Sequence, residues 1–478
     1  MNNLLVMKFG GTSMGSADRI REAARLSMEQ ARERPVLVVV SAMSKITDLL
    51  LDAMRYAEVG DRPGLEARIQ TLQDRHLEAC RELLPPQRQE SVLSGIHALI
   101  AEFQRLTNGM LMLTDRPARS ADEAVAIGER LSALLLASCL ESEGVRSIAI
   151  NSADLIVTDS AFGNATPTFH LTREKARGNL LPWLEGGVLP VATGFNGATT
   201  DGRPTTLGRG GSDFSASILA AALDAAEVWI WTDVDGIMTA DPRLVPDAKV
   251  LTEVTYNEAA ELAYNGAKVL HPRTLAPLVE RGIPVWSKNS FAPKVPGTRI
   301  VPRLEHSTGA RAVTSTAKVA LVSIEPASAA VSGPLLMSKV LEALARVNVE
   351  LLALSSSSFR QSFCFLVRSE ERHTAVIAIE SALALEITHK YVKPIELDEN
   401  VGLLAIVGEG MRGVPGLAGR IFTAISRENI NIIAIAQGSS ELTIAIVVRR
   451  DGLEKAVRAV HAECHMAEAS AAESQQTH

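Results

Sequence analysis

The chain has 478 residues, of which 46% are hydrophobic and 22% are charged, and its net charge is −7. At ~150 residues per domain, this length predicts about three domains with sizeable cores. The negative charge argues against nucleic acid as a partner, although it allows a local phosphate pocket. Cys80, Cys139, Cys364 and Cys464 show no paired spacing, so we expect neither a disulfide framework nor a metal site.

Targeting segments are not evident in the sequence. No apolar run reaches the ~20 residues that a membrane span needs, and the first residues lack a signal-peptide pattern. We therefore expect a soluble, cytoplasmic protein without a membrane partner. Residues 467–478 are small and polar, and we expect them to form a disordered tail.

Apolar runs alternate with helical patterns through the first three hundred residues. The runs NLLVMKF, PVLVVVSA, RSIAI, VLPVATGF and AEVWIWTDV are typical of strands that are buried on both faces. Between them lie helical patterns, for example at 18–33, 122–142, 213–225 and 256–264. This order predicts a doubly wound, mostly parallel α/β sheet over residues 1–300, with a helical excursion at about 49–115.

An internal repeat follows a Pro/Gly-punctuated linker, which we assign to residues 301–315. KVLEALARVNVELLALS (339–355) matches RIFTAISRENINIIAIA (420–436) without a gap. Each copy predicts a helix, an asparagine and two strands. The inward positions of the helix are Leu341 and Leu344 in the first copy, and Phe422 and Ile425 in the second. We expect two small α+β domains, at 316–392 and 393–466, that pack together or onto a partner chain.

A small domain that occurs twice after a larger domain favours a regulatory role for the repeat, and a simple dimerisation module is the alternative. GEGMRG (408–413) fits a glycine pattern of dinucleotide-binding proteins, but no long βαβ unit surrounds it. We expect this loop to permit close helix packing or to line a small-ligand pocket. The chain also lacks the G-x-x-x-x-G-K-[ST] pattern of P-loop proteins.

The stretch MKFGGTSMGS (7–16) predicts an anion site near the start of the chain. A strand that runs into Gly10 and Gly11 ends in a turn whose backbone amides can approach an anion. Lys8 adds a point charge, and Ser16 is expected to cap the next helix. A tight turn with a surface lysine is the alternative.

The stretch TTLGRGGSDFSASILAAAL (205–223) predicts a second anion site. Glycines flank Arg209 just before a helix, and a guanidinium beside helix-start amides suits a carboxylate or phosphate. A solvated Arg209 in a glycine turn is the alternative. WTDVDG (231–236) follows a predicted strand and indicates a ligand site at its carboxyl end. Glu129, by itself, fits a surface glutamate.

Seven motifs, in chain order, resemble those of aspartate kinase. They are KFGGTS (8–13), SKITDLL (44–50), GER (128–130), TLGRGGSD (206–213), WTDVDG (231–236), TADPR (239–243) and GAKVLHPRT (266–274). The repeat resembles the paired ACT domains of that family, and NIIAIAQGSSE (431–441) is similar to the regulatory region of bifunctional aspartate kinase–homoserine dehydrogenases. The chain stops before a dehydrogenase could begin, so we expect it to be monofunctional.

The resemblance implies transfer of the γ-phosphoryl group of ATP to the side-chain carboxylate of L-aspartate, the first step of aspartate-family amino-acid biosynthesis. Mg²⁺ is expected to arrive with ATP, without a prosthetic group. Because the acceptor carboxylate is ionised at pH 7, no general base is needed.

The implied catalytic residues are Lys8 and Asp213. The implied substrate-binding residues are Thr47, Glu129, Arg209, Gly210, Gly211 and Ser212. The implied ATP-binding residues are Lys8, Gly10, Gly11, Ser13, Thr232, Asp233, Met238, Arg243 and Lys268. Met238 stands where the family commonly has a tyrosine, so a hydroxyl contact is lost.

The resemblance also implies feedback inhibition by an end-product amino acid and a homodimer or higher oligomer through the ACT-like domains. The repeat places Gln437 opposite Ser356, and Glu441 opposite Arg360. Gln437 keeps the glutamine implied in threonine sensing, whereas Arg360 would repel a lysine effector. We therefore expect threonine to inhibit more strongly than lysine, through the second copy, with the first copy partly or wholly silent.

Two alternative functions remain open at this point. Another kinase of the same fold, acting for example on glutamate, would share the sheet and the glycine turns, but GRGGSD and the tandem small domains argue against it. A catalytically silent amino-acid sensor would keep the repeat, but it should have lost Lys8 or Lys268, and both are present.

Overall fold

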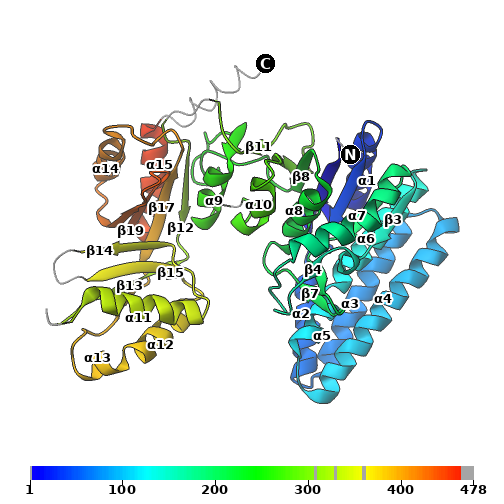
Figure 1. The fold of residues 1–478 in the computed structure, drawn as a ribbon, viewed down its shortest axis with the longest axis horizontal. Coiled ribbons are helices and arrows are strands. Elements are labelled where there is room, and N and C mark those ends of the chain that lie inside the picture. The colour runs from blue at the N-terminus through cyan, green and yellow to red at the C-terminus, as the bar shows by residue number, and fades with distance from the viewer. Residues whose placement is uncertain (1–2, 268, 306–308, 328–330, 358–361, 465–478) are drawn as a thin grey trace. The chain divides into compact units, whose positions relative to one another are not determined.

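The computed structural model describes residues 3–267, 269–305, 309–327, 331–357 and 362–464, and these form two compact units (Figure 1). Met1–Ile237 and Leu270–Pro302 make up the first unit, whereas Met238–Val269 and Arg303–His478 make up the second. This division differs from the domain limit at residue 300 expected from the sequence, because residues 238–269 cluster with the C-terminal part. Lys268, Arg360 and the tail at 467–478 lie outside the described residues.

A mostly parallel sheet forms the centre of the first unit, as the sequence predicts. Its strand order is β3-β5-β2-β1-β8-β10-β11. All of these neighbouring pairs are parallel except β10 and β11, which are antiparallel. The bounds are β1 (Leu5–Phe9), β2 (Val36–Val40), β3 (Ser147–Ile150), β5 (Leu189–Thr193), β8 (Glu227–Thr232), β10 (Val285–Asn289) and β11 (Thr298–Val301).

Helices cover both faces of this sheet, which confirms the doubly wound prediction. Leu5, Met7 and Phe9 of β1 share one core with α1 (Ala17–Ala31) and α6 (Ile127–Ser142). On the other face, where the alternation of the strand directs Lys8, α8 packs beside α7 and α10. The bounds are α7 (Phe169–Glu185), α8 (Gly211–Leu223) and α10 (Pro272–Val279).

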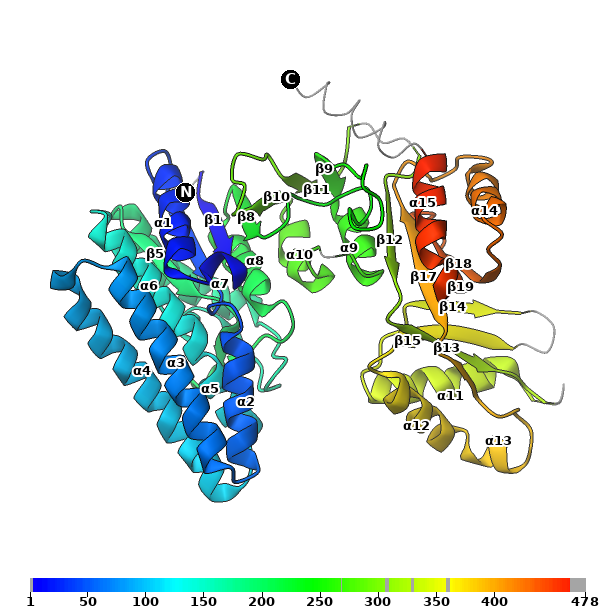
Figure 2. The same ribbon diagram turned by 180° about the vertical axis from the view of Figure 1, so that it is seen from behind.

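Three long helices occupy most of the segment expected to be a helical excursion. They are α2 (Ile46–Glu58), α3 (Arg62–Leu83) and α4 (Pro86–Leu113), and Figure 2 shows them side by side. The predicted helix at 122–142 is two helices, α5 (Ala118–Val125) and α6, which meet at Ala126. A small three-stranded sheet contains β4 (Val157–Thr158), β6 (Asn196–Thr199) and β7 (Pro204–Thr206).

The second unit contains two four-stranded antiparallel sheets, one for each copy of the repeat. The first has the order β14-β15-β13-β16 and the second the order β12-β17-β19-β18. The strands of the first are β13 (Val319–Ile324), β14 (Ala353–Ser356), β15 (Phe363–Arg368) and β16 (Glu396–Asp398), with α11 (Gly333–Arg346), α12 (Arg372–Ala382) and α13 (Ala384–Thr388). The strands of the second are β12 (Ala312–Thr316), β17 (Val401–Val407), β18 (Ile432–Gln437) and β19 (Thr443–Arg449), with α14 (Leu417–Arg427) and α15 (Leu453–Glu463).

The backbone repeats with the sequence. Asn348 and Asn429, which are equivalent in the alignment, both adopt left-handed φ values, 55° and 57°, after their helices. In the first copy the structure confirms Leu344 as an inward position, whereas the prediction is wrong for Leu341, which is 36% exposed while its neighbour Val340 is buried. The equivalent Phe422 is partly buried against the core of its own copy.

Each sheet takes its fourth strand from outside the limits expected for its domain. β12 overlaps the expected linker 301–315, yet it pairs with β17 of the second copy. β16 lies beyond residue 392, yet it pairs with β13 of the first copy. The position of an edge strand is fixed by the strand with which it forms hydrogen bonds and not by its own sequence pattern. The gapless repeat therefore does not reveal which sheet β12 and β16 join.

The two sheets pack against each other, which is one of the two arrangements expected for the repeat. Leu321 and Leu366 of the first sheet share a core with Leu403 and Val447 of the second. Residues 238–269 add β9 (Glu253–Thr255) and α9 (Tyr256–Tyr264) to this unit. Within the part of the chain that the structure describes, no helix has the length and apolar character of a membrane span.

Candidate active site

A cavity of about 710 Å³ lies at the carboxyl ends of β1, β2 and β8. β1 stands between β2 and β8, where the strand order reverses, and open α/β sheets bind ligands at such a point. Most residues predicted from the motifs line this cavity. They are Lys8, Gly10, Gly11, Thr47, Glu129, Arg209, Gly210, Gly211, Ser212, Asp213, Thr232 and Asp233.

Lys8 forms an ion pair with Asp213 on the wall of the cavity. Lys8 Nζ lies 2.5 Å from Asp213 Oδ1, and only 8% of the lysine is exposed. Asp213 is in the first turn of α8, so a strand and a helix far apart in sequence jointly fix the ammonium group. A side chain at Gly10 would approach Lys8 Nζ to 3.3 Å, so the glycine leaves room for this contact.

Glu129 is buried, in contrast to the surface glutamate that its local sequence favours. It is 3% exposed in the first turn of α6, and its Oε1 accepts the backbone N–H of Ala42 at 3.1 Å. Its Oε2 has no hydrogen-bond partner among the described residues. Burial raises the pKa of this carboxyl to about 8, against the opposing effects of the Ala42 N–H and the Lys8 charge. The free oxygen is suited to a cationic group of a ligand.

The Gly208–Gly211 turn presents Arg209 to the cavity. Gly210 has φ 70°, a conformation that favours glycine, and it directly precedes α8. Arg209 is exposed, and no described residue pairs with its guanidinium. A second glycine, Gly194, lets the turn come close, because a Cβ there would lie 2.6 Å from Ser212 Cβ.

The turn that follows β2 adds residues that sequence reasoning missed. Ser41, Ser44 and Lys45 line the cavity beside the predicted Thr47, and Phe195 follows β5 on another part of the wall. Lys45 lies within the motif SKITDLL but is not singled out by it. Because parallel strands end at one edge, the residues after each predicted strand are the signal that could have found Ser41 and Phe195.

Two predicted phosphate contacts need correction. The backbone N–H of Gly10 donates to Trp231 O at 3.2 Å, so it is not free to bind an anion. Ser13 is fully buried, and its hydroxyl contacts the Ser290 hydroxyl at 2.8 Å instead of lining the cavity. The Gly10 amide is used in the hydrogen bond to Trp231, and the Ser13 side chain is used in the packing of the Thr12–Met14 turn.

The residues expected to bind ATP divide between the two units. Thr232 and Asp233 line the cavity, and the Thr232 hydroxyl lies 3.3 Å from Asp233 Oδ1. Met238 and Arg243 belong to the second unit and are not among the lining residues. Arg243 is exposed and pairs with Asp241 at 2.5 Å.

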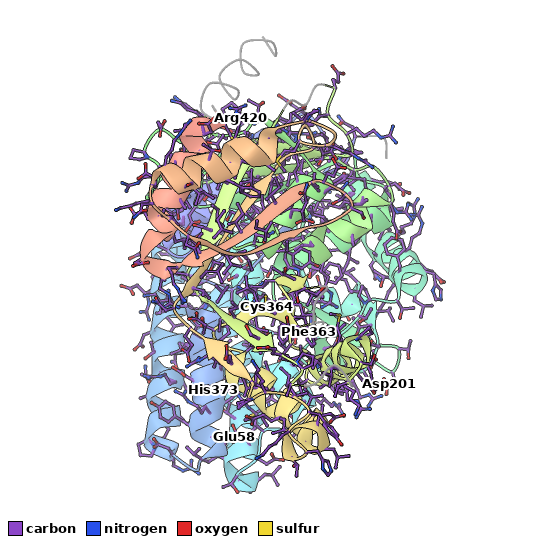
Figure 3. The ribbon with its side chains drawn as sticks, turned by 90° about the vertical axis from the view of Figure 1, so that its left-hand side faces the viewer. Glu58, Asp201, Phe363, Cys364, His373 and Arg420 are labelled. Atoms are coloured by element: carbon purple, nitrogen blue, oxygen red, sulfur yellow. The ribbon has the colours of Figure 1, made fainter. Side chains whose placement is uncertain are left out.

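The second unit has a cavity of about 330 Å³, on the inner face of the first sheet. Serines from β13, β14 and the start of β15 line it together with Cys364, which Figure 3 labels beside Phe363, and with Ile433 of β18. Lys393 Nζ pairs with Glu325 Oε2 at 2.8 Å on its wall. Gln437 ends the edge strand β18, is exposed and does not line this cavity.

The four cysteines are all unpaired. Among the residues that the structure describes, no three His, Cys, Asp or Glu side chains are placed to hold a metal ion together. The GEGMRG loop packs closely, since a Cβ at Gly408 would lie 2.7 Å from Gly309 O. This contact is with the backbone that leads into β12 and not with a helix, so it differs from the close helix packing expected for the loop.

A parallel sheet with a cavity lined by Lys8 and Arg209 at its switch point, followed by paired small α+β domains, defines the class. The model of the amino acid kinase family matches residues 3–289, and an ACT domain model matches residues 404–464. The chain therefore belongs to the amino acid kinase family, and its full-length similarities place it among the aspartokinases.

Relatives of two kinds match nearly the whole chain. Lysine-sensitive aspartokinase 3 of Escherichia coli is 32% identical over 466 residues, which cover 96% of this chain and 99% of that protein. The bifunctional aspartokinase/homoserine dehydrogenase 1 of Arabidopsis thaliana is 34% identical over 469 residues, covering 96% of this chain and 51% of that protein. The chain thus spans about half the length of the bifunctional relatives that it matches.

Solved aspartokinases share the fold. E. coli aspartokinase III in complex with aspartate and ADP has a TM-score of 0.82 and 29% identity, covering 97% of this chain and all of that one. Aspartate kinase from Clostridium acetobutylicum has a TM-score of 0.74 and 26% identity, with the same coverage.

Proposed function

We propose that the protein transfers the γ-phosphoryl group of ATP to the side-chain carboxylate of L-aspartate, giving 4-phospho-L-aspartate. One observation carries the proposal. The buried Glu129 has a free carboxylate oxygen on the wall of the same cavity as the unpaired Arg209 guanidinium and the Lys8–Asp213 pair. An amino acid offers an ammonium and a carboxylate that complement the first two groups. The relative solved with aspartate and ADP supports this assignment.

The substrate is held by its α-amino-acid groups in this proposal. Arg209 binds the α-carboxylate through its planar fork, and Glu129 binds the ammonium group. Thr47, Gly210, Gly211 and Ser212 complete the pocket around the substrate. This arrangement directs the side-chain carboxylate away from Arg209 and Glu129 and toward the phosphoryl donor.

Lys8 and Asp213 serve the transfer itself. A carboxylate oxygen of aspartate forms a bond to the γ-phosphorus, while the bond from that phosphorus to the bridging oxygen breaks and ADP leaves. No proton is removed, because a carboxyl with a pKa of about 3.9 is already ionised at pH 7. The main difficulty is the approach of two anions, which fixed cations and amides relieve. Lys8 supplies the positive charge, and Asp213 holds the Lys8 ammonium in place. Gly11 lets the backbone approach the phosphoryl group closely.

ATP is proposed to enter as its Mg²⁺ complex on the side of Thr232 and Asp233. By resemblance, Met238, Arg243 and Lys268 also contact the nucleotide, with Met238 giving an apolar contact to the base. The reaction would be the first step of aspartate-family amino-acid biosynthesis in the cytoplasm.

Regulation by an end-product amino acid completes the proposal. Threonine is the favoured inhibitor, bound by the second ACT-like copy with Gln437, in a homodimer or higher oligomer formed through these domains. The cavity beside Glu325 and Lys393 is the alternative binding site for the inhibitor. Its paired acidic and basic groups suit a lysine effector, which carries a second ammonium.

An ADP-release assay with a panel of acidic amino acids tests the proposed activity. We expect turnover with L-aspartate to exceed turnover with L-glutamate by at least a hundredfold, because one additional methylene would displace the side-chain carboxylate from the phosphoryl group. Preference for glutamate would identify another kinase of the same fold. An absence of turnover with every amino acid would favour the silent sensor.

A further inference from the structure

Lys45 has an unusual backbone conformation for a lysine. It is the N-cap residue of α2, and its φ of 64° lies in the left-handed region that disfavours residues with a Cβ. Among the described residues, Lys390 is the one other lysine in this region, with φ 59°. Non-glycine residues held in this conformation concentrate at functional sites, where the surrounding structure enforces them.

The turn before Lys45 is fixed at three points. Ser41 N–H donates to Phe9 O at 3.0 Å, and Ala42 N–H donates to Glu129 Oε1 at 3.1 Å. The Arg75 guanidinium donates to the carbonyl of Ser44, immediately before Lys45, at 2.9 Å. These contacts come from β1, α6 and α3, so the surroundings, and not the preference of lysine, set this conformation.

Lys45 is one of three cationic residues in the described lining of the cavity, and it is the one without an assigned role. Its side chain lines the cavity and is exposed, and it makes no hydrogen bond or ion pair with any described residue. The two other cations of the described lining are Lys8, paired with Asp213, and Arg209. In the proposed function, Arg209 binds the α-carboxylate. The second carboxylate of the substrate then has no cation of its own, although it must approach a polyanion.

We propose that Lys45 binds the side-chain carboxylate of the amino-acid substrate and selects for a substrate with a second carboxylate. This inference rests on the proposed function, and it assigns to Lys45 the electrostatic part of substrate recognition. An ammonium beside the acceptor carboxylate offsets its repulsion from the phosphates and leaves no proton to be removed. The amide analogue L-asparagine, which lacks this charge, gains nothing from Lys45.

The test compares Lys45→Gly with wild type, because glycine removes the charge and accepts the left-handed backbone without strain. Calorimetric titration measures aspartate binding, and competition titration measures L-asparagine binding, both independently of turnover. We expect the Kd for aspartate to rise at least tenfold in Lys45→Gly and the Kd for asparagine to change less than twofold. Lys45→Arg should recover aspartate binding to within threefold of wild type.

Lys390→Gly is the matched control, since it relieves the same kind of strain at an exposed lysine of the second unit. Both glycine variants should keep or raise the melting temperature, and Lys390→Gly should bind aspartate like wild type. A less than threefold change in aspartate affinity in Lys45→Gly, or equal losses for aspartate and asparagine, would overturn the assignment. Aspartate binding without phosphoryl transfer would refute the proposed function alone, whereas no aspartate binding by wild type would refute both.

Discussion

At the scale of single residues, the Lys8–Asp213 pair explains how a flexible lysine becomes a fixed part of the cavity. The ammonium lies 2.5 Å from the carboxylate, and the lysine side chain is 10% exposed. Such a lysine loses little further freedom when phosphates bind, so its charge is available without reorganisation. The ion pair is therefore interpreted as a positioning device for Lys8.

Replacing Lys8 with alanine should lower kcat by about a hundredfold or more, because a preorganised charge next to the transferred phosphoryl group is lost. Steady-state kinetics with aspartate and ATP measure the effect. Lys294→Ala, at an exposed lysine outside the cavity lining, is the control and should retain full activity. Turnover of Lys8→Ala within threefold of wild type, with an unchanged melting temperature, would exclude the assigned role.

Glu129 should give aspartate use a pH dependence. With a pKa of about 8 in the free protein, Glu129 is largely protonated at pH 6, and it must ionise to pair with the substrate ammonium. We expect kcat/KM for aspartate to rise from pH 6 through pH 8 and to level off about one pH unit above the pKa of Glu129. Glu129→Gln should have a lower kcat/KM without this rise. The same profile in both proteins would contradict the ammonium role.

The same carboxyl also predicts how stability depends on pH. Its pKa in the folded state is above the unfolded value of about 4.3, so between pH 4.3 and about 8 the folded protein retains a proton that the unfolded chain has released. Glu129 therefore destabilises the fold progressively as pH rises through this window. Denaturation at pH 5.5 and pH 8 should show that Glu129→Gln gains stability relative to wild type at the higher pH.

At the scale of elements, the Gly208–Gly211 turn depends on neighbours outside the cavity lining. Asp122 accepts the Thr206 N–H at 2.8 Å and the Thr206 hydroxyl at 2.9 Å. Arg273 donates to Leu207 O at 3.3 Å and to Ala165 O at 2.8 Å. These contacts fix the strand that enters the turn and thereby the direction of Arg209.

Arg273→Lys should raise the KM for aspartate about tenfold, with a smaller change in kcat, because an ammonium cannot reproduce the several contacts of a planar guanidinium. The KM for ATP should change less than twofold. Arg177→Lys is the control, since Arg177 pairs with Asp224 at the opposite end of α8. Equal effects of the two substitutions on aspartate would show that the turn needs no such support.

Sequence patterns predicted both a strand from its apolar run and a helix from its periodicity. VLVVV at β2 is buried throughout, and α9 begins and ends at the predicted residues. The break between α5 and α6 was missed, because Ala126 and Ile127 carry no glycine or proline signal. That break places Glu129 in a first helical turn, so its burial depends on tertiary packing that the local sequence does not encode.

At the scale of the whole molecule, residues 238–269 are tied to the second ACT-like copy. Arg311 and Glu258 form a buried ion pair at 3.1 Å, and Glu258 also accepts the N–H of Glu409 at 2.9 Å. Thr239 contacts His461 of α15 at 2.9 Å. The segment that carries Met238 and Arg243 therefore belongs to the second unit. If this unit binds the proposed effector, we expect the effector to raise the KM for ATP.

Threonine should inhibit more strongly than lysine, with a coupling of about 1–3 kcal/mol between effector and substrate binding. Gln437→Ala should relieve this inhibition and leave uninhibited turnover unchanged, because Gln437 is exposed on an edge strand outside the first unit. Inhibition curves for both amino acids measure the effect. Calorimetry that detects tight lysine binding and no threonine binding would transfer the effector site to the cavity beside Glu325, and binding of neither would indicate a dimerisation module.

The chemical identity of the product tests the central claim most directly. An acyl phosphate reacts with hydroxylamine to give a hydroxamate, so the reaction of ATP and L-aspartate in the presence of hydroxylamine can be analysed by mass spectrometry against the two synthetic aspartyl hydroxamates. We predict the side-chain hydroxamate, formed in proportion to ADP and strongly reduced in Lys8→Ala. The α-carboxyl hydroxamate, or ADP formed without either hydroxamate, would contradict the orientation in which Arg209 and Glu129 hold the α-groups and leave the side-chain carboxylate to react.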